Sequence, residues 1–248
     1  MIRALLAIVL ATVIALPAAA TDIDNMTDAE RETFRAEVRA YLLDNPEVLA
    51  EAIAVLRQRE AEAETVQDQR MVAANADAIF NDGFSWVGGN PDGDITIVEF
   101  LDYRCTYCKK AFPEVAELLS SDGNIRFIVK EFPILGEASV LASRFAIAVK
   151  NVEGDEAYGE VHDRLMTLRA EISESSLKRL AEDMELDFEA IFAEMNSDEI
   201  TAIIRANHEL ADKLNISGTP AFVMEDQMLR GYVPLADMRR IVAALRAQ

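Results

Sequence analysis

The chain has 248 residues, of which 51% are hydrophobic and 27% charged, and its formal net charge is −20. This apolar content is sufficient for a folded core, whereas ten glycines and seven prolines are too few for a disordered or fibrous chain. The acidity argues against unaided binding to nucleic acid or to an anionic membrane, because either surface would repel it. Two cysteines exclude a disulfide-rich scaffold, and with two histidines they leave few ligands for a multi-metal site.

The first twenty residues have the pattern of a signal peptide. Arg3 precedes an apolar run from Ala4 to Leu16, and Pro17-Ala18-Ala19-Ala20 then supplies the small residues that signal peptidase recognises. The run is shorter than the roughly 20 residues of a membrane-spanning helix, and no later stretch is long and apolar enough. An uncleaved N-terminal anchor is the alternative. We expect residues 1–20 to be removed and the mature chain to enter an oxidising compartment without inserting into the membrane.

Residues 21–82 are predicted to form helices. Thr27-Asp28-Ala29-Glu30 is a capping box for a first helix, and Asn45-Pro46 starts a second helix that stops at Asn81-Asp82-Gly83. The first half of this second helix carries an apolar stripe, whereas Arg57 to Arg70 is mostly polar. The stripe could fold back onto its own domain or meet copies of itself. Because the polar stretch separates the stripe from the rest of the chain, we favour a helical oligomerisation segment and stalk.

After residue 83 the pattern changes to strands and helices. Phe84 to Val87 reads as a short strand, and Ile95 to Leu101 is a β-branched and aromatic run that is typical of a buried strand. A helix begins near Cys105, and another strand runs from Ile125 to Lys130. A strand, a crossover helix and a strand at this spacing form a βαβ unit, so the two strands should be parallel neighbours.

The second half of the chain begins with a helical insertion. Residues 138–214 read as helices throughout, with starts near Asp155, Ser173 and Ser197. Two strands follow at 221–224 and 228–232, and an amphipathic helix begins at Pro234. The predicted order is therefore βαβ, a helical insertion and ββα, which is an α/β fold class.

The cysteines form the motif Cys105-Thr106-Tyr107-Cys108 at the predicted strand-to-helix junction. At a helix start, Cys105 lies beside unpaired backbone N–H groups and the positive end of the helix dipole, and both stabilise a thiolate over a thiol. Cys108 lies one turn further into the helix, so it should be more buried and act as the resolving thiol. This pattern predicts a redox-active pair.

Three other interpretations of the pair are weaker. A disulfide that closes a four-residue loop removes little chain entropy, and two unrelated cysteines would meet at this junction only by accident. A zinc or copper site would need further ligands, but His162 and His208 lie in the helical insertion, where we expect them to be solvated or to cap helices. We therefore predict no metal site and no cofactor.

Several motifs resemble those of the DsbA-type thioredoxin-fold disulfide oxidoreductases. Val98-Glu99-Phe100 before the cysteines and Gly218-Thr219-Pro220 before a strand match landmarks of that family. The resemblance covers Phe84 to Gln248 and includes the family's helical insertion. Three further stretches are similar to the Com1/ScsC branch, in which some ScsC proteins form trimers: residues 130–136, 231–234 and 41–47.

The resemblance implies a thioredoxin fold with an inserted helical subdomain at about 136–214, within a catalytic domain of residues 83–248. It also implies periplasmic thiol–disulfide exchange, with Cys105 as the nucleophile and Cys108 as its partner. The expected partners are cysteine-containing exported proteins, an unidentified membrane redox partner, and copies of the same chain, with a trimer favoured.

The resemblance assigns roles to residues around the thiols as well. Pro220 would be a cis proline facing Cys105, and Thr219 and Pro220 would present their backbone to a substrate peptide. Glu99 and Lys130 match a buried acid–lysine pair near the cysteines, but Glu99 could equally be a surface charge on an edge strand.

The dipeptide between the cysteines leaves the direction of the reaction open. Thr106 and Tyr107 replace the Pro-His of the strongest oxidases, while a threonine before the proline also occurs in isomerase relatives. We therefore predict an oxidoreductase that forms or isomerises disulfides. The alternative is a non-catalytic, copper-buffering or chaperone-like protein that uses the thiols as ligands.

Overall fold

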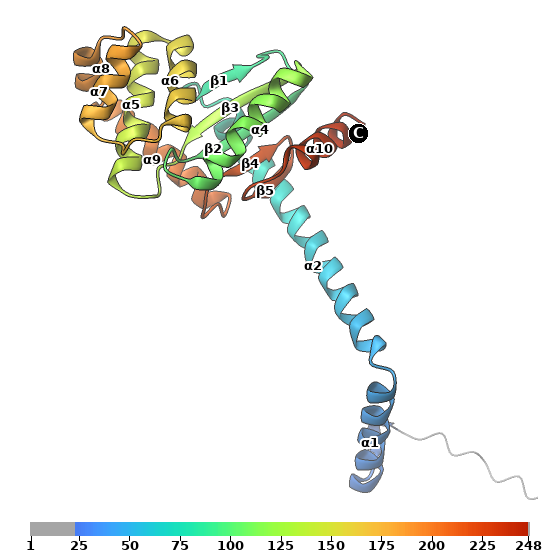
Figure 1. Cartoon of the computed structure of the whole chain (residues 1–248). Helices are drawn as coiled ribbons and strands as arrows, with labels where there is room; N and C mark the ends of the chain where they lie inside the picture. Colours follow the sequence, from blue (N-terminus) through green and yellow to red (C-terminus); the bar gives the residue numbers. More distant parts are fainter. Residues whose placement is uncertain (1–22, 248) are drawn as a thin grey trace, which may run out of the picture. The chain divides into compact units, whose positions relative to one another are not determined.

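A computed structural model describes residues 23–247, and the predicted signal peptide at residues 1–20 lies outside them. The chain divides into two compact units, Met1–Glu60 and Ala61–Gln248. In the described part of the chain, no helix combines the length and the apolar character needed to cross a membrane. Figure 1 shows the order of the elements along the chain.

The first unit contains helix α1 (Asp28–Asp44) and the beginning of helix α2 (Glu47–Ala74), after a short 3₁₀ helix at Ile23–Asn25. The predicted capping box is confirmed: the backbone N–H of Thr27 donates to Glu30 Oε2 at 2.8 Å, and the Glu30 N–H donates to the Thr27 hydroxyl. No described residue of α1 is buried. The large apolar side chains exposed on these helices are Phe34, Val38, Tyr41, Leu43, Leu49, Ile53, Val55 and Leu56.

The second unit begins at Ala61, within α2, and not near Gly83 as the sequence indicated. The C-terminal part of α2 and the short helix α3 (Ala76–Phe80) pack into the core of this unit. Val72 is 4% exposed and Ile79 is fully buried against strand residues. Residues 61–82 therefore belong structurally to the larger unit, and the predicted boundary shifts toward the N-terminus.

Ion pairs also fix the end of α2 to the second unit. The Arg230 guanidinium donates to both carboxylate oxygens of Asp68 at 2.8 Å, and Gln69 Nε2 donates to Asp226 at 2.7 Å. The helix breaks at Asn75, where the sequence predicted an uninterrupted helix to Asn81. The polar composition of this stretch predicted a helix without packed neighbours, because its partners lie about 160 residues away along the chain.

A five-stranded sheet in the order β1-β3-β2-β4-β5 forms the centre of the second unit. β2 and β3 are parallel neighbours, as predicted, and the other pairs are antiparallel. The predicted bounds of β2 and β4 are confirmed, whereas β1 and β5 are each displaced by one or two residues at both ends. The strands are β1 (Trp86–Gly89), β2 (Ile95–Leu101), β3 (Ile125–Glu131), β4 (Ala221–Met224) and β5 (Gln227–Arg230).

Helices cover both faces of the sheet (Figure 1). Helices α4 (Thr106–Asp122) and α10 (Leu235–Arg246) pack on one face, and α3 and the end of α9 pack on the other. The helical insertion follows β3 and contains α5 (Glu137–Glu153), α6 (Asp155–Thr167), α7 (Glu174–Asp183), α8 (Phe188–Glu194) and α9 (Asp198–Lys213). The expected mixed α/β fold with inserted helices and preceding N-terminal helices is confirmed.

Candidate active site

Cys105 is the N-cap of α4, so its sulfur lies at the helix start. The Cys108 backbone N–H donates to Cys105 Sγ at 3.4 Å, and the Cys105 thiol donates to the Thr219 carbonyl oxygen at 3.1 Å. Cys105 is 7% exposed and Cys108 is fully buried, and both are free thiols. The predicted order of exposure is therefore correct, although Cys105 is less accessible than we expected.

The loop before β4 supplies the opposite side of the site. The Thr219–Pro220 peptide bond is cis, as the resemblance implied, and the Pro220 carbonyl accepts from the Gly231 N–H at 2.9 Å. The Thr219 side chain is half-buried and its carbonyl points to Cys105. The structure therefore brings Cys105, Thr219 and Pro220 together from segments more than 100 residues apart.

Two tyrosine rings lie beside each other near the start of α4, which carries the thiols. Thr106 is exposed, and Tyr107 is 60% exposed with its ring 6.4 Å from that of Tyr232. Lys110 Nζ lies 3.9 Å from the centre of the Tyr232 ring, and the Tyr232 hydroxyl donates to Glu114. These contacts hold Tyr232 in place, whereas most of the Tyr107 side chain stays exposed.

Glu99 lies in the interior, on the face of β2 that packs against α4. It is 2% exposed, and within the described residues its Oε1 atom has no hydrogen-bond partner. Burial raises its pKa to about 8. Burial, followed by the charge of Glu99, also raises the pKa of the Cys108 thiol far above its ordinary value. The alternative of an edge-strand surface charge is wrong, because β2 lies between β3 and β4.

Lys130 does not pair with Glu99. The parallel register places Glu99 beside Val129 and Phe100 beside Lys130, so the two charged side chains point to opposite faces of the sheet. Lys130 Nζ instead forms an ion pair with Asp82 and donates to the Ala78 carbonyl at 2.8 Å. The acid–lysine pair implied by the resemblance is therefore corrected to Asp82–Lys130, on the face away from α4.

A second buried carboxylate, Glu131, lies on the same face as Glu99 and was not predicted from the sequence. It accepts hydrogen bonds from the hydroxyls of Tyr103 at 2.8 Å, Tyr158 at 2.6 Å and Ser143 at 2.6 Å. Burial raises its pKa to about 7 against the effect of these hydrogen bonds.

His162 contacts Tyr103 through Nδ1 at 3.3 Å and is 4% exposed, so the prediction that it is solvated or capping was wrong. Burial lowers the pKa of His162 to about 4.

Asp102 is the other functional candidate that the sequence analysis missed. Its buried carboxylate orders the segment before Cys105, and its carbonyl accepts from the Cys105 N–H at 3.0 Å. The only signal in the sequence was an acidic residue directly after a buried strand. The carboxylate accepts from the backbone N–H groups of Arg104, Ile134 and Leu135 and from the Ser139 hydroxyl, at 2.7 to 3.0 Å.

Potential metal ligands do not gather into a site within residues 23–247. No group of three or more His, Cys, Asp or Glu side chains in this range is arranged to hold a metal ion. His162 is enclosed by aromatic rings, and His208 lies against Phe132. Neither histidine therefore joins the two thiols in the arrangement that a tetrahedral site would need.

A paired-thiol motif at a helix N-terminus, opposite a cis proline on a mixed sheet, defines a thioredoxin-fold protein of the dithiol type. The DSBA-like thioredoxin domain matches residues 96–243, and the chain belongs to this family. The copper resistance protein ScsC N-terminal domain matches residues 30–63. The resemblance inferred from the sequence is therefore confirmed for both parts of the chain.

Solved structures of thioredoxin-like proteins agree with this assignment. A thioredoxin-like oxidoreductase from Silicibacter pomeroyi DSS-3 is 39% identical, with 69% of this chain and 98% of that chain covered and a TM-score of 0.66. Proteus mirabilis ScsC in a transitional conformation is 30% identical, with 89% and 97% covered and a TM-score of 0.64. The Na(+)/H(+) antiporter NhaA 3 of Salinispora tropica is 29% identical over 58% of this chain, and the match spans 22% of the antiporter's length.

Proposed function

We propose that this protein is a periplasmic thiol:disulfide oxidoreductase that forms or isomerises disulfides in exported proteins. The observation that carries the proposal is the position of Cys105, whose sulfur lies at the start of α4 and contacts the Thr219 carbonyl at 3.1 Å. The Cys108 N–H donates to this sulfur at 3.4 Å, and a helix start presents backbone donors and the positive end of the helix dipole to a group placed there. Cys108 lies behind it, fully buried, in the position of a resolving thiol.

The chemistry would proceed in two exchange steps. The Cys105 thiolate attacks one sulfur of a client disulfide, forms a mixed disulfide and releases the other client sulfur as a thiolate. Cys108 then loses its proton and attacks Cys105, which releases the reduced client and leaves the Cys105–Cys108 disulfide. The same steps in reverse oxidise a client dithiol. Burial has the largest effect in raising the pKa of Cys108, and the charge of the buried Glu99 carboxylate raises it further. We propose that the protonation state of Glu99 controls how readily Cys108 loses this proton.

The client peptide would lie between the loop before β4 and the start of α4. The backbone of Thr219 and Pro220 offers hydrogen-bonding groups beside Cys105, and Tyr107 offers an exposed ring on the other side. Contacts of this kind recognise a backbone and an apolar side chain, but no particular sequence. This breadth suits a protein that acts on many exported chains, and a membrane redox partner would restore its starting redox state.

We further propose that the first unit joins several copies of the chain. Its large apolar side chains remain uncovered in the single chain, and the region matches the N-terminal domain of ScsC. Association would bury these side chains and place several dithiols around one client at a high effective concentration. This arrangement favours isomerisation over a single oxidation step. We propose a homo-oligomer, and favour a trimer.

The proposed activity is tested with a protein substrate that contains scrambled disulfides. The full-length protein should restore the native disulfides in a glutathione buffer, and Cys105→Ser should abolish this activity. Ser175→Ala, on the exposed surface of α7, serves as the matched control and should retain it. Full activity of the Cys105→Ser protein would contradict the proposal.

A further inference from the structure

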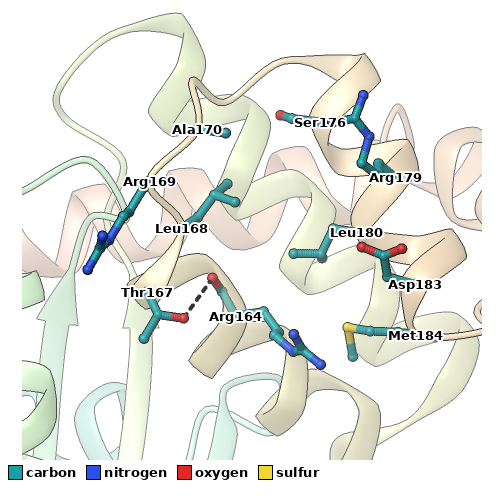
Figure 2. A pocket seen from close by; sticks show the side chains of 10 residues that line it. All are labelled: Arg164, Thr167, Leu168, Arg169, Ala170, Ser176, Arg179, Leu180, Asp183 and Met184. Carbon is teal, nitrogen blue, oxygen red and sulfur yellow. Dashed lines mark hydrogen bonds between the residues drawn. The ribbon is translucent and has the colours of Figure 1, made fainter.

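A pocket of about 310 Å³ opens in the helical insertion, away from the dithiol itself. Figure 2 shows its lining, which comes from the end of α6, the loop that follows, and α7. Leu168, Leu180 and Met184 supply the apolar part of this lining. The pocket is therefore large enough to hold a side chain and the adjoining backbone of a bound peptide.

Three arginines line this pocket, and each comes from a different segment. Arg164 lies on α6, Arg169 on the connecting loop and Arg179 on α7, and all three are exposed. Within residues 23–247, none of these guanidinium groups has an ion pair or a hydrogen bond. By contrast, Arg246 binds two carboxylates, Asp94 and Asp122. We call the three-arginine site the Arg pocket.

The Arg pocket is an exception in a strongly acidic chain. The formal net charge of −20 repels an acidic client, and such repulsion acts over a screening length of about 8 Å at physiological salt. Unpaired guanidinium groups place positive charge at this pocket and can bind carboxylates through two hydrogen bonds each. One carboxylate, Asp183, also lines the pocket and opposes this effect.

A hydrogen bond ties the Arg pocket to the candidate active site. Lys109, which follows Cys108 in α4, donates from Nζ to the Leu168 carbonyl at 2.7 Å. Lys109 lies four residues after Cys105, which is about 6 Å along a helix axis. The rise along α4, the length of the Lys109 side chain and the hydrogen bond add up to roughly 15 Å, so a client held at Cys105 would reach the pocket with on the order of five residues of extended chain, at about 3.3 Å per residue.

We propose that the Arg pocket binds an acidic segment of the client protein, in which carboxylates flank an apolar side chain, while a client cysteine reacts at Cys105. The carboxylates pair with Arg164 and Arg179, and the apolar side chain contacts Leu180 and Met184. The inference rests on the proposed function and names the class of client that the protein prefers. Its consequence is selective capture of acidic clients that the rest of the surface repels.

The test compares two synthetic peptides that differ only in charge. Each contains a disulfide between two cysteines and, five residues away, either Glu-Leu-Glu or Gln-Leu-Gln. Reduced full-length protein should reduce the acidic peptide with a kcat/KM about five-fold higher, which corresponds to about 1 kcal/mol for two exposed ion pairs. High salt should lower this preference.

Charge variants then locate the effect. Arg164→Gln/Arg179→Gln should bring the preference to one or below, and Asp183→Asn should increase it. Arg205→Gln/Arg240→Gln removes the same charge from exposed positions on α9 and α10 and should leave the preference unchanged. If both peptides react and the two double variants behave alike, the Arg pocket is not the binding site. If neither peptide reacts with any form, the proposed function itself fails.

Discussion

Replacing Glu99 with glutamine should remove a large pH dependence of stability. Burial raises the pKa of this carboxyl from 4.5 to about 8 in the folded chain. Between these values the unfolded chain is ionised while the folded chain keeps the proton, so the folded state binds more protons there and stability falls as pH rises. This difference in pKa corresponds to at most about 5 kcal/mol of the free energy of unfolding, which is lost as the pH rises from 4.5 to 8.

Urea unfolding at pH 5 and pH 9 measures this loss, with the thiols kept reduced. Glu99→Gln should be more stable than the original protein by several kcal/mol at pH 9, and close to it at pH 5. Glu117→Gln, an exposed carboxyl on α4, is the matched control and should shift stability little at either pH. An equal difference between Glu99→Gln and the original protein at both pH values would contradict a raised pKa of Glu99 in the folded chain.

Three further predictions concern other parts of the chain. Arg230→Ala should lower the free energy of unfolding by about 1 kcal/mol, because its ion pair with Asp68 is one-third exposed on the arginine side. In urea unfolding, adding Asp68→Ala to this variant should lower the stability little further. Additive losses would contradict a direct pair. Burial lowers the pKa of His162 to about 4, so between pH 6.5 and pH 4 only the unfolded chain takes up the proton and the free energy of unfolding falls by about 3 kcal/mol. His162→Phe should remove this loss, which thermal melts at both pH values detect. Identical pH profiles of the two proteins would contradict the prediction. Leu49→Ser/Ile53→Ser should shift the full-length protein to a monomer in light scattering, whereas an unchanged mass would place the contact elsewhere.

The sequence was sufficient for elements whose signals are local. β2 was placed correctly because a run of buried, β-branched residues is bounded by turn residues, and α1 because Thr27 and Glu30 form a capping box. The thiol pair was found for the same reason, since both cysteines and the helix start lie within four residues. Glu99 stayed ambiguous, because its burial depends on strands that pair with β2 from far along the chain.

Features that depend on distant contacts were not accessible. The partner of Lys130 follows from the register between β2 and β3, which sets the face of each side chain, and the sequence alone does not fix that register. The end of α2 is held to the second unit by Arg230, far along the chain, and Glu131 is surrounded by hydroxyls from three other elements or loops. The buried position of His162 follows equally from tertiary packing.

Trapping a mixed disulfide identifies which of the two thiols is the nucleophile. Replacing Cys108 with serine removes the resolving thiol, so a client attacked by Cys105 stays bound through a disulfide. Mass spectrometry of the Cys108→Ser protein, incubated with a disulfide-containing client and kept non-reduced, should identify that bond at Cys105. Absence of the adduct, together with adduct formation through Cys108 in the Cys105→Ser protein, would contradict the assignment of the nucleophile.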